Sequence, residues 1–398
     1  MSLMAPVLEN PETGERFVDR KRYLWLMSAV YPLAPLFFIV LAYATGWAGW
    51  LWAMPVAFYG VVTLLDHVTG EDTNNPPEWA VPMLEEDRFY RYLVYAAVPA
   101  QFATLVASAW AVGSGVFPWW GVAGLAVSMG IIGAFALNLG HELGHKKTES
   151  ERWLAKLVLT TVAYGHFFIE HNKGHHRDVA TPEDPASSRM GENLYQFMLR
   201  EIPGAARRAW KIEAERMQRK GRSVFSLDNE IVQTGLMTAV LYGALTWAFG
   251  WIVLPFLLVQ AAIGWFHLTL ANYIEHYGLL RQKLPSGRYE RCSPEHSWNT
   301  NHITSNLILF HLQRHSDHHA NPTRRYQSLR NFEGLPTLPS GYPGMWLAAM
   351  VPPLWRAIMD KRLLAHYGHD MTRINVDPAK REALFARHHR PREENAAA

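Results

Sequence analysis

Long uncharged apolar stretches, separated by charged sequence, dominate this chain. Six stretches are each long enough to cross roughly 30 Å of hydrocarbon as a helix, and they come in three pairs: 23–45 with 47–65, 93–112 with 116–137, and 231–250 with 251–274. The link within each pair is short and uncharged, whereas the charged segments lie between pairs or at the ends. This pattern predicts an all-α integral membrane protein whose six transmembrane helices form three hairpins on one polar cap.

The charges that flank the first stretch predict its orientation. Lysine and arginine concentrate on the cytoplasmic side of membrane helices, and four basic residues precede the first span: Arg16, Arg20, Lys21 and Arg22. We therefore expect a cytoplasmic N-terminal segment (1–22), one membrane-embedded domain with a cytoplasmic cap (23–378) and a polar C-terminal tail (379–398). Ala42-Tyr43-Ala44 resembles a signal-peptide cleavage site, but the preceding apolar run is too long for a signal peptide.

The composition of the chain limits the kinds of metal site and binding partner that it can have. The chain has 398 residues and one cysteine, Cys292, which excludes internal disulfides and any four-cysteine zinc or iron–sulfur module built from this chain alone. A net charge of +3 gives no support for nucleic-acid binding. The basic stretch 200–222 suits either anionic lipid headgroups or an acidic electron carrier, and its candidate docking residues are Arg207, Arg208, Lys211, Arg216 and Arg219.

Histidines gather where apolar stretches give way to polar sequence. Nine of the nineteen are His141 and His145 in HELGH, His171, His175 and His176 in HNKGHH, His276 in NYIEHYG, and His315, His318 and His319 in HSDHH. Neutral imidazole binds iron, zinc, copper or nickel, and one ion takes about four to six ligands. Nine histidines therefore predict two metal ions close together.

Helical spacing makes this prediction more specific. His141 and His145 are four residues apart, so they share one helical face just beyond a membrane span. His171 and His175 share a face, with His176 about 100° away, and His315, His318 and His319 fall within an arc of about 100°. Adjacent histidines can therefore address different ions. HELGH also matches the HExxH zinc-hydrolase motif with Glu142 as general base, which leaves a zinc protease open as an alternative.

Other polar residues near the motifs have a supporting role. A carboxylate can accept the second N–H of a ligand imidazole and fix the ring, and the candidates are Glu142, Glu170, Asp178, Asp184, Glu275 and Asp317. The remaining histidines of the spans and cap are assigned structural roles: His67, His166, His267, His296, His302 and His311. His267 is about 180° from His276 on an unbroken helix, whereas His311, one turn before His315, is the strongest exception.

The chain resembles the membrane-bound alkane 1-monooxygenases, which belong to the histidine-rich diiron enzymes of bacterial inner membranes. The resemblance is carried by the segments GEDTNNPPE, NLGHELGHKK, FIEHNKGHHRDVATPEDP, ANYIEHYGLLRQK and FHLQRHSDHH. The resemblance covers nearly the whole chain. It implies that the nine histidines bind two non-haem iron ions. It also implies terminal hydroxylation of medium-chain linear alkanes with dioxygen, using electrons that a reductase passes through rubredoxin.

Three other functions share part of these features. A membrane fatty-acyl desaturase would yield an alkene instead of an alcohol, a zinc protease would use HELGH alone, and a metal carrier or sensor would bind metal without consuming oxygen. An alkane partitions into the bilayer, so its enzyme should open a narrow channel into the membrane. We expect bulky residues near Phe58 and Tyr59 to line that channel.

Overall fold

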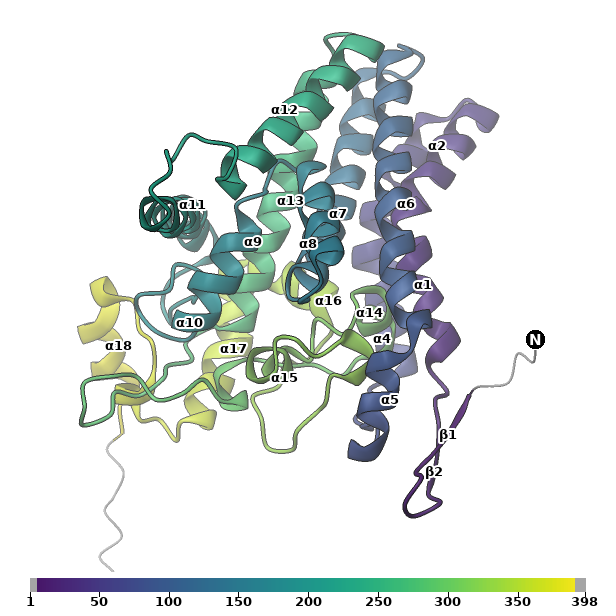
Figure 1. Ribbon diagram of the computed structural model, residues 1–398. Coiled ribbons are helices and arrows are strands. Elements are labelled where there is room, and N and C mark those ends of the chain that lie inside the picture. Colours follow the sequence, from purple (N-terminus) through teal and green to yellow (C-terminus); the bar gives the residue numbers. More distant parts are fainter. Residues whose placement is uncertain (1–5, 391–398) are drawn as a thin grey trace, which may run out of the picture.

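The computed structural model describes residues 6–390 and is almost entirely helical (Figure 1). Six helices are long and apolar enough to cross a membrane: Arg22–Thr45, Ala48–Thr69, Arg88–Gly113, Trp119–Gly144, Glu230–Phe249 and Val253–Glu275. All six predicted spans are therefore confirmed. The largest shift in a boundary is in the fourth span, which continues to Gly144 instead of ending near residue 137. This extension carries HELGH on the same helix.

The first two spans are segmented. The first comprises η1 (Arg22–Trp25), α1 (Leu26–Val30), η2 (Tyr31–Leu33) and α2 (Ala34–Thr45). Prolines lack the N–H that continues an α-helix, and Pro32 and Pro35 lie where the first span changes helix type. The second comprises η3 (Ala48–Trp52), α3 (Ala53–Pro55), the π-helix η4 (Val56–Val62) and α4 (Thr63–Thr69).

The other four spans are continuous and form two hairpins, α6 (Arg88–Gly113) with α7 (Trp119–Gly144), and α12 (Glu230–Phe249) with α13 (Val253–Glu275). Helices α7 and α13 pack against each other more extensively than any other pair of described elements. Small residues let membrane helices approach closely, and a Cβ atom on Gly264 would lie 3.4 Å from the carbonyl carbon of Gly133. His145 and His276 are the C-cap residues of α7 and α13, so this helix contact helps to set the distance between two histidine motifs.

The cap is built from the segments between the hairpins and from the last third of the chain (Figure 1). Its helices are α5 (Val81–Glu86), α8 (Glu149–Thr160), α9 (Phe167–Glu170), η6 (His171–His175), α10 (His176–Asp178), α11 (Leu194–Arg219), α14 (Ile303–Ile308), α15 (His315–Ala320), α16 (Tyr342–Met350) and α17 (Pro352–His366). The basic stretch forms helix α11. The apolar stretches do not indicate α8, an amphipathic helix that packs against α7, or α16, a short apolar helix that packs against α13.

Both terminal segments contain structure that the sequence analysis did not anticipate. Strands β1 (Val7–Glu9) and β2 (Arg16–Val18) form an antiparallel hairpin before the first span. The expected polar tail from residue 379 begins as helix α18 (Arg381–His388), whose Leu384 packs against the core. Phe385, the next residue on α18, also packs against the core. The rest of the tail, 391–398, lies outside the described residues.

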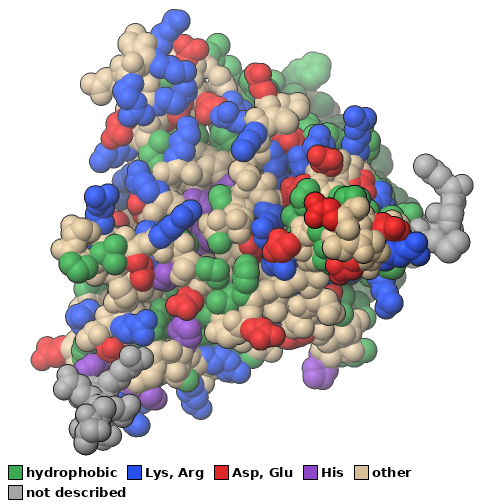
Figure 2. Space-filling view, turned by 60° about the horizontal axis from the view of Figure 1, so that its bottom comes forward, with side chains coloured by type: hydrophobic (Ala, Val, Ile, Leu, Met, Phe, Trp, Pro, Cys, Tyr) green, Lys and Arg blue, Asp and Glu red, His purple; other side chains and the backbone are tan. Residues whose placement is uncertain are grey.

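The two ends of the helical bundle differ in surface chemistry. Large aromatic side chains at the hairpin turns away from the cap are highly exposed: Trp119 by 82%, Trp247 by 90% and Trp251 by 81%. Exposed tryptophans of this kind are typical of a membrane interface. The cap face instead carries intermixed basic and acidic side chains (Figure 2). The chain is therefore an integral membrane protein with a polar cap on one side.

Replacing Gly264 by valine should force α13 away from α7. A Cβ atom at this position would already be in van der Waals contact with the backbone of Gly133 and Gly130, so the two methyl groups of valine would have to displace that backbone. We expect a loss of about 1–3 kcal/mol in stability, measured by thermal unfolding in detergent. The matched control is Gly243→Val on α12, where an added Cβ atom meets open space. Equal unfolding temperatures for the two variants would contradict this account of the helix contact.

Candidate metal centre

The nine histidines singled out from the sequence come together at the boundary between the bundle and the cap. Their ring nitrogens form two groups, within each of which the potential ligand atoms lie no more than 4.8 Å apart. We call these the five-histidine cluster (His141, His145, His171, His176 and His318) and the four-histidine cluster (His175, His276, His315 and His319). The prediction of two closely spaced metal-binding groups is confirmed.

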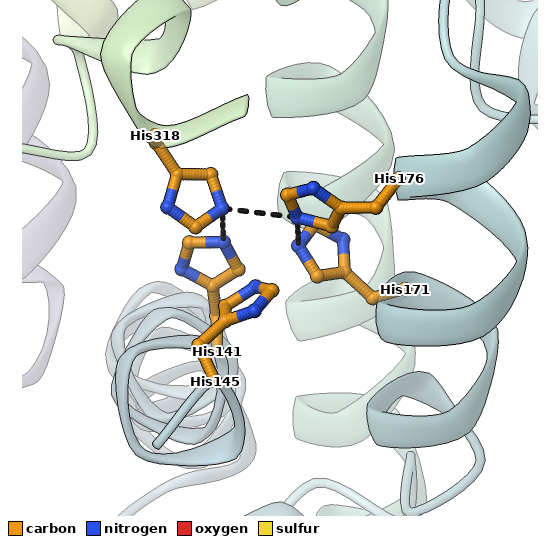
Figure 3. Close-up of side chains that lie close together, drawn as sticks. All are labelled: His141, His145, His171, His176 and His318. Carbon is orange, nitrogen blue, oxygen red and sulfur yellow. Dashed lines mark hydrogen bonds between the residues drawn. The ribbon is translucent and has the colours of Figure 1, made fainter. Parts of the chain in front are cut away.

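The five-histidine cluster draws on three separate segments (Figure 3). The helical-face prediction for HELGH is confirmed, since the end of α7 directs both His141 and His145 into this cluster. The Nε2 atoms of His141 and His318 are 2.8 Å apart, and the Nε2 atom of His176 is 3.1 Å from those of His171 and His318. Two nitrogens bound to one ion at about 2.1 Å and at a right angle would lie about 3.0 Å apart. The observed spacing therefore fits a bound metal ion.

The four-histidine cluster has the same convergence. The Nε2 atom of His315 is 3.2 Å from that of His276 and 2.9 Å from that of His319. The buried Nε2 atom of His175 has no hydrogen-bond partner, although buried polar atoms are nearly always paired. Both observations fit a metal ion that accepts these lone pairs.

The second motif departs from the helical prediction. We expected His171 and His175 to share a face, but they belong to different clusters, and His171 pairs with His176. The reason is local: His171–His175 form the π-helix η6, in which i→i+5 hydrogen bonds align residues five positions apart. In the third motif His318 joins the five-histidine cluster, whereas His315 and His319 join the other. Adjacent histidines thus address different clusters, as predicted.

Burial keeps these rings in the form that binds metal. Burial and then repulsion from neighbouring imidazoles lower the pKa of a set of ring nitrogens well below the usual value: His145, His171, His176, His315, His318 and His319. Burial also lowers the pKa of His276 to about 3. These rings are therefore neutral at pH 7, with a lone pair free for a cation.

Two of the predicted carboxylates contact cluster imidazoles. Asp184 accepts a 2.8 Å hydrogen bond from Nδ1 of His175, which leaves Nε2 directed into the cluster. Burial depresses the pKa of His175, but the charge and hydrogen bond of Asp184 outweigh burial and raise it overall. Glu275 approaches from the other side, because its Oε2 is 3.3 Å from Nε2 of His315 while Oε1 accepts a hydrogen bond from Tyr342. Glu275 therefore borders the metal-facing side of the four-histidine cluster.

The other predicted carboxylates pair with cations instead of imidazoles. Glu142 lies 2.9 Å from Lys146, so it turns away from the five-histidine cluster. That position does not fit the general base of a HExxH hydrolase, which must reach the reacting water. Glu170 and Asp178 bind Arg208, and Asp317 lies 2.8 Å from Arg324.

Arg208 is paired with carboxylates inside the protein and is not available on the surface. It was a candidate for docking an electron carrier, but its guanidinium lies in the protein, where it bonds Glu170 and donates to Asp184 at 2.7 Å. A Cβ atom on Gly174 would lie 2.6 Å from Nε of Arg208, which explains the glycine in HNKGHH. Arg216 is likewise paired with Glu213. Of the five candidates, Arg207, Lys211 and Arg219 remain exposed.

The six histidines assigned structural roles lie outside both clusters. His311 is not an exception, because the chain before His315 is not helical: Phe310 and His311 both have a φ of 51°. The His311 ring packs edge-on against Trp25 and donates to the carbonyl of Tyr326. His267 accepts a 2.6 Å hydrogen bond from Tyr59 and lines a cavity that reaches the clusters.

This cavity runs between the membrane helices and ends at the metal-binding groups. Its inner end is formed by His141, His171, His315 and Glu275, and its apolar wall includes Tyr31, Phe58, Phe135, Phe167, Leu309 and Trp346. Phe58 lines this cavity directly, whereas Tyr59 reaches it only through His267. The free volume is about 40 Å³, so a hydrocarbon chain enters only when wall side chains move.

Sequence reasoning missed several of these residues. Tyr342 and Trp346 lie on α16, whose approach to the clusters follows from tertiary packing alone. Asn138 precedes His141 by one helical turn, so its place beside the cavity could have been read from the spacing.

Comparison with known proteins agrees with this geometry. Residues 117–349 match the fatty acid desaturase family. The chain is 56% identical over 374 residues to an alkane 1-monooxygenase of Ectopseudomonas oleovorans, which covers 94% of this chain and 93% of that protein. It is 57% identical over 372 residues to alkane 1-monooxygenase 1 of Alcanivorax borkumensis, covering 93% and 91%.

A more distant relative has a related activity. The xylene/toluene monooxygenase hydroxylase component of Pseudomonas putida is 27% identical over 270 residues, which cover 67% of this chain and 69% of that protein. Taken with two histidine clusters at the end of a membrane cavity, the near-complete match to the first two relatives shows that this chain belongs to the alkane 1-monooxygenases, within the fatty acid desaturase family.

Proposed function

We propose that this enzyme hydroxylates the terminal carbon of medium-chain linear alkanes with two iron ions held by the nine histidines. The observation that carries the proposal is the apolar cavity whose inner end is bounded by residues of both clusters. An alkane has no polar group to recognise, so burial and chain shape must position it. An apolar cavity with a metal site at one end would position an alkane in this way.

The protein's own residues would bind the iron ions, orient the alkane and exclude water. When bound, the iron ions would supply the oxidising power to break a C–H bond, which side chains cannot supply. The ligands would be the nine histidines, with Asp184 fixing the His175 ring through Nδ1 and Glu275 beside His315. The aromatic wall, including Tyr31 and Phe135, would keep bulk water from the reacting carbon. A narrow cavity admits a chain end before a chain middle, which would favour the terminal position.

The chain contains no redox cofactor site built from cysteine, so we infer an external electron donor. Rubredoxin, reduced by its reductase, fits the exposed basic residues Arg207, Lys211 and Arg219 on α11, because complementary charge speeds encounter between an acidic carrier and its partner. We further propose that the cap and both termini lie on the cytoplasmic side of the inner membrane, as the basic residues before the first span indicate.

Two alternatives can be separated from the proposed function. A zinc protease would need Glu142 at the metal, but Glu142 pairs with Lys146. A fatty-acyl desaturase would share the metal site, so the geometry of the clusters does not distinguish it. Product analysis separates it from a hydroxylase, because octane would give an alkene in place of 1-octanol.

Metal analysis of the protein purified in detergent should give about two irons per chain, since the two clusters offer nine imidazoles. His276→Ala removes a ligand from the four-histidine cluster. We expect it to lower the iron content to about one per chain and to abolish octane hydroxylation. His67→Ala, at an exposed position outside both clusters, is the matched control. Full iron content with normal turnover in His276→Ala would remove His276 from the ligand set.

Phe58→Ala should widen the cavity near its outer part, because this buried ring forms part of the wall. We expect the preferred alkane to become longer, measured by competition among alkanes of different length. Phe37→Ala, at a position 59% exposed on α2, is the control and should leave the preference unchanged. An unchanged preference in an active Phe58→Ala enzyme would contradict the proposed location of the channel.

Reversing charge at Arg207 and Lys211 together should slow hydroxylation about 10-fold at limiting rubredoxin and low salt, because electrostatic steering is lost. High salt should reduce the difference between variant and wild type, since it screens exposed charges. Lys361→Glu, an exposed basic position on α17, is the control. If the variant behaves like wild type at all salt concentrations, the exposed basic residues of α11 do not dock rubredoxin, and binding to lipid headgroups is the remaining role.

A further inference from the structure

The second and sixth spans are joined beside the alkane cavity by one pair of side chains. Tyr59 on η4 donates a 2.6 Å hydrogen bond to Nε2 of His267 on α13. Within residues 6–390 no other side-chain hydrogen bond joins these two spans. The spans also pack little on each other, because the second packs mainly on α7 and α16, and the sixth on α7, α11 and α12. The gap between the two spans is therefore bridged by side chains and not by helix backbone.

The two members of this pair differ in freedom of movement. His267 is 3% exposed, and its Nδ1 donates a 2.7 Å hydrogen bond to the carbonyl of Ile263, which holds Nε2 toward Tyr59. Tyr59 is half-buried, and its hydroxyl has no second partner among the described residues. It lies on the π-helix Val56–Val62, a distortion that is rare in proteins and frequent at functional sites. His267 is thus the fixed member of the pair, and Tyr59 is the member that can move.

The pair lies between two spaces. His267 lines the alkane cavity, whereas Tyr59 lines a separate outer pocket of about 400 Å³ together with Gly60, Thr63 and Leu64 of the same span. A Cβ atom on Gly60 would meet open space. The Tyr59 ring can therefore swing into the outer pocket without displacing a helix.

The gap between the two spans faces the lipid. Val56 and Leu64 on the second span are 67% and 61% exposed, and Val259 on the sixth span is 48% exposed. Exposed apolar side chains on a membrane span face the hydrocarbon of the bilayer. An alkane dissolved in the bilayer therefore reaches this gap without passing through water.

The gap also lies at the end of the cavity away from the metal-binding groups. The cavity follows one face of α13 from His267 to Glu275, a distance of about 12 Å along the helix axis. Its free volume of about 40 Å³ is close to the space of one water molecule, so a wall side chain must move before an alkane fits. The backbone contact between Gly133 and Gly264 leaves α7 and α13 no such freedom.

We propose that Tyr59 and His267 form a lateral gate for the alkane. When their hydrogen bond breaks, the Tyr59 ring swings into the outer pocket, and the chain enters from the bilayer between the second and sixth spans. A hydrogen bond of this kind favours the bonded state by up to about 10-fold, so the gate is mostly shut and opens by thermal motion. An alkane offers no hydrogen bond in exchange, so the pair forms again behind it. This inference rests on the proposed function, because it takes the cavity to hold an alkane.

The rate of alkane entry can be measured in the resting protein with an octane analogue that carries a diazirine. Illumination after increasing delays attaches the analogue to cavity residues such as Phe135, and peptide mass spectrometry measures the labelled fraction. Tyr59→Phe keeps the ring and removes the hydrogen bond, so labelling should be about 3–10-fold faster. Gly60→Trp fills the outer pocket and hinders the swing of Tyr59, so labelling should be about 10-fold slower.

Two matched controls should label at the wild-type rate. Tyr43→Phe removes a hydroxyl that bonds Ser114 at the end of the third span, away from the cavity. Gly243→Trp adds a large ring in open space on α12. Iron content and unfolding temperature should be unchanged in all four variants. Gly60→Trp should lower kcat/KM for octane in parallel with labelling, whereas Tyr59→Phe should not lower it.

Wild-type labelling rates in both Tyr59→Phe and Gly60→Trp would overturn the proposal, because the alkane would then enter elsewhere. Loss of iron or of folding in both variants would also overturn it, since the pair would then be structural. If labelling follows the expected order but the wild type does not hydroxylate octane, the proposed function is refuted and the gate stands.

Discussion

The convergence of nine neutral imidazoles in a buried space is the constraint on which the rest of the structure depends. Lone pairs that face one another at 2.8–3.2 Å repel, so the fold must hold them until a cation replaces that repulsion with bonds. The surrounding protein does this with rigid contacts: Gly133 against Gly264 between two spans, and Asp184 against the His175 ring. The metal centre and the bundle are therefore stabilised by each other.

Much of this arrangement could be predicted from the sequence. Uncharged runs revealed the six spans, and the HELGH spacing placed His141 and His145 on one face, because both depend on local periodicity. The pairing of His171 with His176 could not be predicted, since it results from a π-helix that the spacing does not reveal. Helices α8 and α16 were not predicted, because they are shorter than a membrane span and are buried only through tertiary contacts. Arg208 looked like a surface charge until its carboxylate partners were known.

The surroundings of the clusters differ between the membrane spans and the cap. The alkane cavity is walled by membrane spans and aromatic rings, whereas the tightly packed region beside His171 and His175 is lined mostly by polar side chains such as Glu170. His171 and Asn272 belong to both linings. One buried centre therefore has an apolar side that suits a hydrocarbon and a polar side formed by the cap. The cap is thus as much a part of the site as the spans.

The sequence distance between the ligands has a consequence for how the protein is made. His141 and His318 touch although 177 residues separate them, and each cluster includes residues from the HSDHH segment. A chain emerging from the ribosome can insert its hairpins as they appear, yet it can complete neither cluster until the HSDHH segment has been synthesised. Contacts so distant in sequence form late. Metal capture is therefore a closing step of biogenesis, one that a truncated chain cannot reach.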